Sequence, residues 1–600
     1  MKKFITSMLA VFLVMAIFLT GCSDKAGNDV GTGGSADGQV SGSTSAVTEA
    51  GTDQGTDANA KESGEPAWKT NNSPVTLTWY TGVAGYSKEW DAENVYVDKL
   101  ITEETGVTVD FIHAGTDVNA QFNTMLASNN LPDLVTLDRW NSTSLIQTFI
   151  DSGKAAPMNK LIEEYAPTFK KIIPQSMIEW YTKADGNWYG FPNYFAAEEL
   201  LEQYPEVRQD YLEKGNNQIY ARKDIMDQLG ITVEDLSKED TLIEALKKVK
   251  NANVKYNGVT VVPLYFDDKS LYSNNSIGVI ASSFGAVYED EDGSYIDMRR
   301  TPEFKEALRF VNRLSREGLL DLENFTSDKN QVSEKMLQGA IFMRIGSIAD
   351  YQNEVNQLYL SDPNAKYVPI PAIQSNNGGK PQFGRTLNKG WTLTFVSNDS
   401  EHKDRAIQFI EYLYSEHGQT VAYFGKEGET YKVTENGKYV KTDDVYNEYM
   451  SDWDAASKKW GMESIWWMCN DIWLAHVTEE DTSEQSGYIN SIFTANKGYI
   501  YLNDAFDSGN LFDAIEPGSE EAKAEAKIDV RWEEMLPKMI FAKTEEEFEN
   551  IYAETMSQLE KLGIEKVEAA KDVKVQEMKK GMGADYISPK YTGKYYYSNK

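Results

Sequence analysis

The chain contains little cysteine and little histidine for its length. Its 600 residues include 2 cysteines and 4 histidines, and the histidines lie far apart, at His113, His402, His417 and His476. Two cysteines cannot cross-link a chain of this size, and a zinc site needs about three or four nitrogen or sulfur ligands close together. The composition therefore excludes a disulfide scaffold and argues against a His/Cys metalloenzyme.

Positive charge is also scarce relative to negative charge. The sequence has 59 Lys and Arg residues against 93 Asp and Glu residues, so its formal net charge is −34 at pH 7. A surface this acidic repels the phosphates of nucleic acids and of anionic lipids. We therefore expect no nucleic acid partner.

Aromatic side chains that carry a polar group are, by contrast, abundant. The chain has 13 Trp and 34 Tyr residues, whose rings combine apolar faces with hydrogen-bonding edges. This surplus favours a planar or sugar-like ligand. The chain is 41% hydrophobic, enough to fill the cores of about two to four domains at roughly 150 residues each.

A single apolar run approaches the length of a membrane span, and it lies at the N-terminus. Two lysines follow Met1, residues 4–18 are largely apolar, and Leu-Thr-Gly-Cys ends the run at residues 19–22. The pattern predicts a secretory signal peptide over residues 1–21. The four residues resemble the lipobox of bacterial lipoproteins, which implies cleavage before Cys22 and a diacylglycerol on its thiol. An ordinary signal peptide with an incidental cysteine is the alternative.

Residues 22–69 are predicted to form the lipid anchor and a disordered tether. From Ser23 to Ala67 the chain is mostly Gly, Ser, Thr, Ala, Asp and Glu, with no aromatic residue. Such a segment cannot bury enough apolar surface to offset its ordering entropy. Some 45 residues of this kind span roughly 35–40 Å on average, which would carry a globular body away from a membrane.

The start of the globular part alternates strands and helices. Residues 75–79 and 107–112 carry strand patterns, residues 90–104 between them are amphipathic, and residues 131–137 predict a third strand. Strand, helix and strand within about forty residues indicate a parallel α/β unit. Because ligands of such sheets bind at the carboxyl ends of strands, the loops that begin at Tyr80 and Asp138 are the first candidate sites.

Several segments of the chain together match one known family. They are Asn130–Thr136, Trp188–Pro192, Ile219–Gly230, Gly339–Ser347, and Phe424–Tyr431 followed by Glu435–Lys438. In this order, and with the lipobox, the chain resembles the extracellular solute-binding lipoproteins of bacterial ABC sugar importers (family 1, LplA/YtcQ-like branch). The resemblance covers roughly residues 70–580.

The resemblance implies an α/β, two-lobed fold of the periplasmic-binding-protein type II, with an interlobe ligand cleft and crossover hinges. Lobe one would comprise residues 70–192 and 393–445, and lobe two residues 193–392 and 446–600. The crossovers would then lie near Phe191–Pro192, near Gly390–Trp391 and within residues 432–460.

The function implied by the resemblance is capture of an extracellular carbohydrate, an oligosaccharide, and its delivery to the permease subunits of an ABC transporter. The protein would act as a monomer at the extracellular face of the cell membrane, held there by its lipid alone. An oligopeptide- or amino-acid-binding lipoprotein is one alternative, and a lipid-anchored glycosidase or lyase is another. The sequence has no Gly-x-Ser-x-Gly, His-Glu-x-x-His or Cys-x-x-Cys motif, which argues against an enzyme.

No cofactor or metal is expected. Many members of the family carry a calcium loop rich in Asp and Asn after the helix that here ends near Lys250. The corresponding segment, residues 251–258, has no carboxylate. Calcium sites usually include charged oxygen ligands, so we expect this site to be absent.

A sugar site needs rings for its C–H faces and polar groups for its hydroxyls. The residues predicted to bind the ligand are Trp79, Tyr80, Asp138, Arg139, Trp140, Tyr189, Tyr265, Arg344, Ser347, Trp391, Trp466 and Trp467. Asp138-Arg139-Trp140 combines both kinds of group directly after a strand, and resembles the cleft loop of maltodextrin-binding relatives. An Asp/Arg surface pair beside a packing tryptophan is the alternative.

The other candidates carry alternatives of their own. Since strand residues alternate faces, we expect only one of Trp79 and Tyr80 to face the cleft. Arg344 lies within an apolar strand, where it needs a partner, and an internal salt bridge would supply one. The Trp466-Trp467 pair serves either as a stacking platform or as part of a helical core. Arg139, Arg344, Arg385 and Lys389 would suit a uronate, although neutral oligosaccharides also accept hydrogen bonds from arginine.

Overall fold

The computed structural model describes residues 64–83, 86–115, 117–139, 141–266, 276–320, 323, 326–327, 329–480, 484–506, 511, 514–516, 518–582 and 590. The predicted signal peptide, Cys22, most of the predicted tether and Trp140 lie outside these ranges. Within them, no helix has the length and apolar character needed to cross a membrane.

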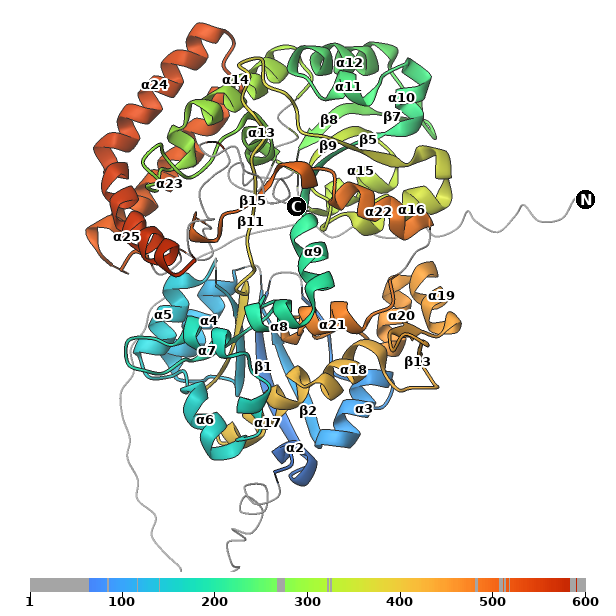
Figure 1. The fold of residues 1–600 in the computed structure, drawn as a ribbon, viewed down its shortest axis with the longest axis vertical. Coiled ribbons are helices and arrows are strands. Elements are labelled where there is room, and N and C mark those ends of the chain that lie inside the picture. The colour runs from blue at the N-terminus through green and yellow to red at the C-terminus, as the bar shows by residue number, and fades with distance from the viewer. Residues whose placement is uncertain are drawn as a thin grey trace, which may run out of the picture. The chain divides into compact units, whose positions relative to one another are not determined.

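The first sheet has five strands in the order β2-β1-β3-β12-β4; Figure 1 labels β1 and β2 among them. They are β1 (Val75–Gly82), β2 (Val107–His113), β3 (Leu134–Asp138), β4 (Gly190–Pro192) and β12 (Thr392–Val396). β1 pairs in parallel with β2 and β3, whereas β12 is antiparallel to both β3 and β4. The chain therefore leaves this sheet after Pro192 and returns to it at Thr392. The strands predicted at residues 75–79, 107–112 and 131–137 are confirmed.

Helices within residues 67–181 and 403–460 surround the first sheet. They are α2 (Ala67–Thr70), α3 (Tyr96–Thr105), α4 (Val118–Ser128), α5 (Thr143–Asp151), α6 (Met158–Tyr165), α7 (Gln175–Tyr181), α17 (Lys403–Tyr414), α18 (Glu416–Phe424), α19 (Asp443–Ser451) and α20 (Trp453–Trp460). The buried core between them and the sheet is strongly aromatic, with Trp79, Phe111, Phe409 and Trp467 in ring contact.

The second sheet has four strands in the order β10-β5-β9-β8. They are β5 (Asn217–Arg222), β8 (Val262–Phe266), β9 (Ile341–Ser347) and β10 (Tyr367–Ile370). β8 and β9 run in parallel, and β5 is antiparallel to β9 and β10. The carboxyl ends of β8 and β9 therefore share an edge with the amino end of β5.

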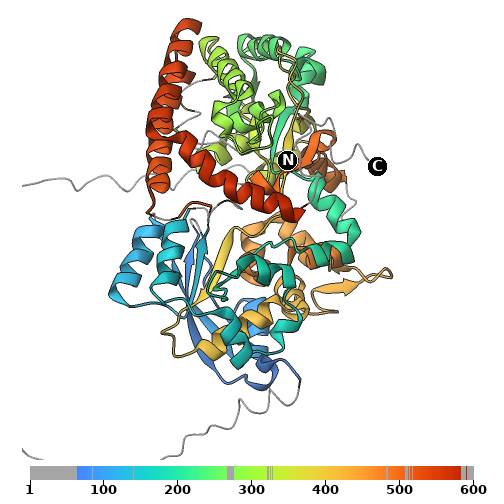
Figure 2. The ribbon, with the colours of Figure 1, turned by 60° about the vertical axis from the view of Figure 1, so that its left-hand side comes forward.

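The helices around the second sheet include the long C-terminal ones. They are α10 (Lys223–Leu229), α11 (Val233–Leu236), α12 (Glu239–Ala252), α13 (Ser276–Phe284), α14 (Pro302–Arg316), α15 (Lys329–Leu337), α16 (Gln352–Ser361), α22 (Glu484–Phe493), α23 (Glu520–Ile540), α24 (Glu545–Leu562) and α25 (Ile564–Met582). Thr544 caps α24 by accepting from the Glu547 N–H at 3.1 Å. Gly563, with φ 99°, allows the change of direction between α24 and α25 that Figure 2 shows.

The segment without carboxylates at residues 251–258 ends α12 and leads into a tight hairpin. β6 (Lys255–Tyr256) and β7 (Val259–Thr260) are joined by Asn257 and Gly258. Both turn residues have positive φ, 50° and 87°, which is the conformation that an Asn-Gly hairpin turn requires. The backbone here closes a two-residue turn instead of opening into a long loop.

The predicted lobe boundary at residue 446 does not follow the packing. Tyr449, Ile465 and Trp467 are buried in the same core as Trp79, beneath the first sheet. Ile492 is buried in a core of the second sheet, with Tyr220 and Tyr265. The chain therefore stays with the first sheet until at least Met468, because the buried side chains of α19, α20 and the following turn belong to the core of that sheet. The third crossover, predicted within residues 432–460, lies later in the chain.

Candidate functional site

The carboxyl edge of the first sheet brings together segments far apart in the sequence. β1 ends at Gly82, which pairs with Leu137 of β3, and Asp138 at the end of β3 pairs with Thr392 at the start of β12. Because β12 is antiparallel to β3, Trp391 precedes its strand at the same edge where Asp138 ends its own. This is the edge that the sequence predicted to carry the site.

Trp391 and Trp466 form a parallel ring stack. Their centroids are 5.2 Å apart and their planes differ by 6°, and both side chains are partly exposed. Trp466 belongs to a short 3-10 turn, Trp466–Met468. The stack therefore offers an apolar face at the carboxyl edge of the first sheet, and we call these two rings the tryptophan platform.

The backbone of Trp391 is held by hydrogen bonds on both sides. Its carbonyl accepts from the Arg139 N–H at 2.9 Å. Its N–H donates to the Asn193 side-chain oxygen at 3.0 Å, and the same oxygen accepts from the Thr392 N–H at 2.9 Å. Asn193 is fully buried. The platform thus rests on a fixed segment of main chain.

The guanidinium of Arg139 lies behind the platform. Arg139 is fully buried and donates to the Tyr181 hydroxyl at 2.7 Å, to the Lys389 carbonyl at 2.7 Å and to the Gly390 carbonyl at 2.9 Å. It therefore fixes the main chain just before Trp391. The sequence did not identify Asn193 or Tyr181, because each acts through contacts with residues about 200 positions away.

Asp138 stands at the rim of the same edge. Its side chain is partly exposed and accepts from the N–H of Asn141 at 3.2 Å and from the side-chain amide of Asn141 at 2.6 Å. Asn119 extends this polar rim by donating to the Asn141 carbonyl at 2.9 Å. The carboxylate and amides can exchange hydrogen bonds with hydroxyl groups. Trp140, between Asp138 and Asn141, lies outside the described residues.

Trp79, Tyr80 and Trp467 lie in the core beneath this edge. The Trp79 indole donates to Thr136 Oγ1 at 2.9 Å, and the Tyr80 hydroxyl donates to the Val118 carbonyl at 2.9 Å. Burial, reinforced by Asp117, raises the pKa of Tyr80 to about 12. All three side chains are fully buried. The expectation that one of Trp79 and Tyr80 faces outward therefore finds no support in this conformation, because polar groups inside the core satisfy both.

Tyr265, Arg344 and Ser347 lie together on the second sheet. Tyr265 pairs with Arg344 across β8 and β9, and both are buried. The guanidinium carbon of Arg344 is 3.7 Å from the ring centroid of Tyr351, which is a cation–π contact. Ser347 ends β9, and its hydroxyl accepts from the Asp350 N–H at 3.1 Å.

Tyr189 is separated from the other candidates. It precedes β4, whose Gly190 pairs with Phe395 near the end of β12. This places Tyr189 at the edge of the first sheet opposite the platform. Its hydroxyl donates to Asp185 at 2.5 Å, and hydrogen bonds from Asn187 and Tyr189 lower the pKa of Asp185 to about 2. The geometry favours a structural role for this tyrosine.

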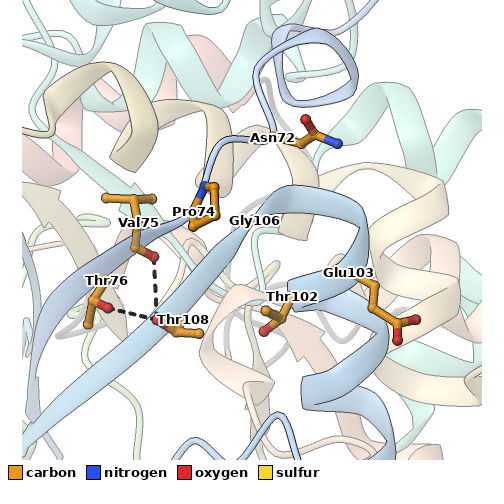
Figure 3. Close-up of a pocket in the computed structure, with 8 residues that line it drawn as sticks. All are labelled: Asn72, Pro74, Val75, Thr76, Thr102, Glu103, Gly106 and Thr108. Carbon is orange, nitrogen blue, oxygen red and sulfur yellow. Dashed lines mark hydrogen bonds between the residues drawn. The ribbon is translucent and has the colours of Figure 1, made fainter.

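Two grooves lie away from the carboxyl edge of the first sheet. One, of about 390 Å³, is at the amino ends of β1 and β2. Figure 3 shows that Thr76 and Thr108, which line it, bond to one another, at 2.8 Å. A wider one, of about 990 Å³, is lined by Trp68, Tyr204 and Trp473 among others. Neither contains a predicted ligand residue. Among the described residues, no group of three or more His, Cys, Asp or Glu side chains is placed to hold a metal ion.

Comparison with known families gives one match. The sequence pattern of the family described as bacterial extracellular solute-binding protein matches residues 89–420, more than half of the chain.

Two curated relatives are similar to the chain. The fructooligosaccharide ABC transporter substrate-binding protein FusA of Streptococcus pneumoniae is 25% identical over 269 residues, 43% of this chain and 47% of FusA. The polygalacturonan/rhamnogalacturonan-binding protein YtcQ of Bacillus subtilis is 22% identical over 386 residues, 64% of this chain and 72% of YtcQ. The chain thus spans about half the length of the first of these relatives.

Solved structures resemble the chain over most of its length. FusA of S. pneumoniae in complex with kestose has a TM-score of 0.65 at 18% identity, covering 84% of this chain and all of that one. A solute-binding protein of Bifidobacterium longum infantis, described as binding HMO, has a TM-score of 0.60 at 15% identity, covering 84% and 99%. At these identities the likeness establishes the fold, which is the two-lobed α/β fold that the sequence predicts.

Proposed function

Since this chain belongs to the family of bacterial extracellular solute-binding proteins, we propose that it captures an extracellular oligosaccharide between its two lobes and delivers it to an ABC transporter permease. The observation that carries this proposal is the tryptophan platform, Trp391 and Trp466, beside Asp138 at the carboxyl edge of the first sheet.

The chemistry of this edge suits a sugar. A pyranose or furanose has C–H faces that pack on an indole ring and hydroxyls that donate to a carboxylate. The stacked rings provide the first surface, and Asp138 with the amides of Asn119 and Asn141 provides the second. The names of FusA and YtcQ, both of which refer to oligomeric or polymeric carbohydrates, support an oligosaccharide over a single sugar.

The proposal includes the site of action. A lipid on Cys22, which the lipobox resemblance supports, would hold the protein at the extracellular face of the membrane. The protein would act there as a monomer and release its ligand chemically unchanged.

The test is a binding screen of the purified protein followed by calorimetric titration. The screen contains oligosaccharides, amino acids and peptides. For the best sugar, Trp391→Ala should weaken binding by about 5- to 150-fold, corresponding to the roughly 1–3 kcal/mol expected of one stacked ring. The matched control is Trp453→Ala, which removes a tryptophan that is 41% exposed on α20 and should leave affinity unchanged.

Three outcomes would contradict the proposal. Binding of a peptide or an amino acid in place of any sugar would establish the alternative ligand class. Shortened or unsaturated sugar after prolonged incubation would show an enzyme. Equal losses of affinity for Trp391→Ala and Trp453→Ala would remove the platform from the site.

A further inference from the structure

We infer that the ligand is a neutral oligosaccharide and that uronates are excluded. The inference rests on the proposed function and concerns the charge of the bound sugar. A site for uronates needs cationic donors aimed at carboxylates, because an anion taken out of water without such partners is strongly disfavoured. Four cationic side chains near the predicted site, Arg139, Arg344, Arg385 and Lys389, could supply these donors, and the structure gives each of them other neighbours.

The two most central cations are inaccessible. Arg139 has no exposed surface, and its guanidinium donates to Tyr181, Lys389 and Gly390. Arg344 also has no exposed surface, and its guanidinium lies 3.7 Å from the centroid of the Tyr351 ring. A ligand carboxylate could reach either only after the surrounding core had opened.

The other two cations contact carbonyls and rings of the crossover segments. Arg385 donates to the carbonyl of Lys214 at 3.1 Å and to that of Gly384 at 3.0 Å. Lys389 donates to the Ala196 carbonyl at 3.3 Å, and its ammonium is 4.8 Å from the Phe195 ring centroid. Recruiting either for a carboxylate would break a contact that joins two distant parts of the chain.

Among the described residues, two lysines beside the strand ends of the second sheet face carboxylates. Lys329 lies 3.5 Å from Asp350, just after β9, and Lys497 lies 3.8 Å from Glu213, just before β5. Their charges are thus already compensated at the edge where β5, β8 and β9 meet.

Negative charges around the tryptophan platform also disfavour a uronate. Asp138 borders the platform, and Glu89, 76% exposed in its side chain, stands 3.3 Å from His113 at the end of β2. The chain as a whole carries a net charge of −34. A polyuronate with one negative charge per sugar would be repelled at long range and would meet a carboxylate at the platform. A neutral sugar would instead donate its hydroxyls to Asp138.

The experiment compares neutral and uronic oligosaccharides of equal length, titrated into the full protein at about 20 mM and about 500 mM NaCl, a range over which charge interactions are increasingly screened. The neutral panel contains fructo-, gluco-, manno- and xylo-oligosaccharides, and the uronic panel contains oligogalacturonates and oligomannuronates. We expect a neutral ligand whose affinity changes less than about 2-fold with salt, and uronates that bind at least about 100-fold more weakly.

A pair of variants provides a second measurement. Asp138→Asn should weaken the neutral ligand by about 5-fold or more, because the amide accepts less strongly than the carboxylate. Asp399→Asn changes the net charge equally at the opposite edge of the sheet, where Asp399 pairs with Lys154, and should have no effect on affinity.

The inference and the proposed function fail in different ways. The inference would be overturned if a uronate bound more tightly than every neutral sugar, or if Asp138→Asn bound the neutral ligand more tightly than the wild type does. Either result would leave oligosaccharide capture in place. Absence of binding to both sugar panels, together with binding of a peptide, would overturn the proposed function and the inference with it.

Discussion

Replacing Arg139 tests whether this residue positions the tryptophan platform from behind. In Arg139→Met the side chain keeps its length and loses its donors, so the hydrogen bonds at 2.7, 2.7 and 2.9 Å to Tyr181, Lys389 and Gly390 disappear. The Tyr181 hydroxyl still donates to the Lys389 carbonyl, but the Gly390 carbonyl loses this donor inside the core.

The size of the effect follows from these contacts. A hydrogen bond to a charged group contributes about 1.5–3 kcal/mol, and a buried acceptor left without its donor costs about 1–3 kcal/mol. Since the three bonds share one nitrogen and are not additive, we expect a loss of about 3–5 kcal/mol in the unfolding free energy of the first lobe. For a lobe of about 200 residues this lowers Tm by roughly 6–15 °C.

Affinity should fall for an indirect reason. Without the guanidinium the main chain before Trp391 is less fixed, so the ligand must order it on binding, and we expect a loss of about 10-fold. Arg139→Lys, which retains one charged donor group, should recover part of the lost unfolding free energy and part of the lost affinity. The assays are thermal melting without ligand and calorimetric titration with the identified sugar.

One result would refute this reasoning. If Arg139→Met lost affinity while its melting temperature stayed that of the wild type, the guanidinium would contact the ligand directly, and its burial in the unliganded state would not describe the binding conformation.

Two further predictions concern the anchor and a buried acid. Cys22→Ala should release the protein to the medium or leave it unprocessed, and membrane retention of a normally matured variant, measured by fractionation, would contradict the lipoprotein assignment. Burial raises the pKa of Glu411 from 4.5 to about 7, so the folded state binds more protons than the unfolded state between these values. The free energy of unfolding should therefore fall by about 2–3 kcal/mol as pH rises from about 4.5 to 7. Melting curves of Glu411→Gln should lack this fall. The control Glu163→Gln, which changes an exposed residue of α6, should retain it.

The strands of the first sheet were predictable because their signals are local. Apolar and polar side chains alternate over much of residues 75–82 and 107–113. Residues 134–138 form a short, largely apolar run that ends in a polar residue. Such patterns need no knowledge of the rest of the chain. The antiparallel insertion of β12 between β3 and β4 is a long-range pairing, which no local pattern specifies. The family resemblance supplied the crossover that produces it.

The third crossover was misplaced for a related reason. Residues 443–460 are amphipathic helices whose apolar faces could cover either sheet, and the sequence does not say which. Tyr449 and Ala456 are buried beneath the first sheet, so these helices complete the core that α3 and α18 begin. Only the three-dimensional packing distinguishes the two assignments.

Trp466 and Trp467 are adjacent, but Trp467 is buried in the core and Trp466 is partly exposed at the proposed binding surface. Consecutive residues of a 3-10 turn point about 120° apart, so an adjacent pair at a core boundary sends one ring inward and the other outward. Trp467 packs at 4.3 Å against Tyr86 and 5.7 Å against Trp79, and it holds Trp466 at 85° to itself. Among the described residues the indole N–H of Trp467 has no hydrogen-bond partner, which costs about 1–3 kcal/mol, so ring packing is what this residue provides. With Trp466 fixed by the core and Trp391 fixed by Arg139 and Asn193, the first lobe presents its half of the proposed site already assembled, and little of the binding free energy needs to be used to order the platform.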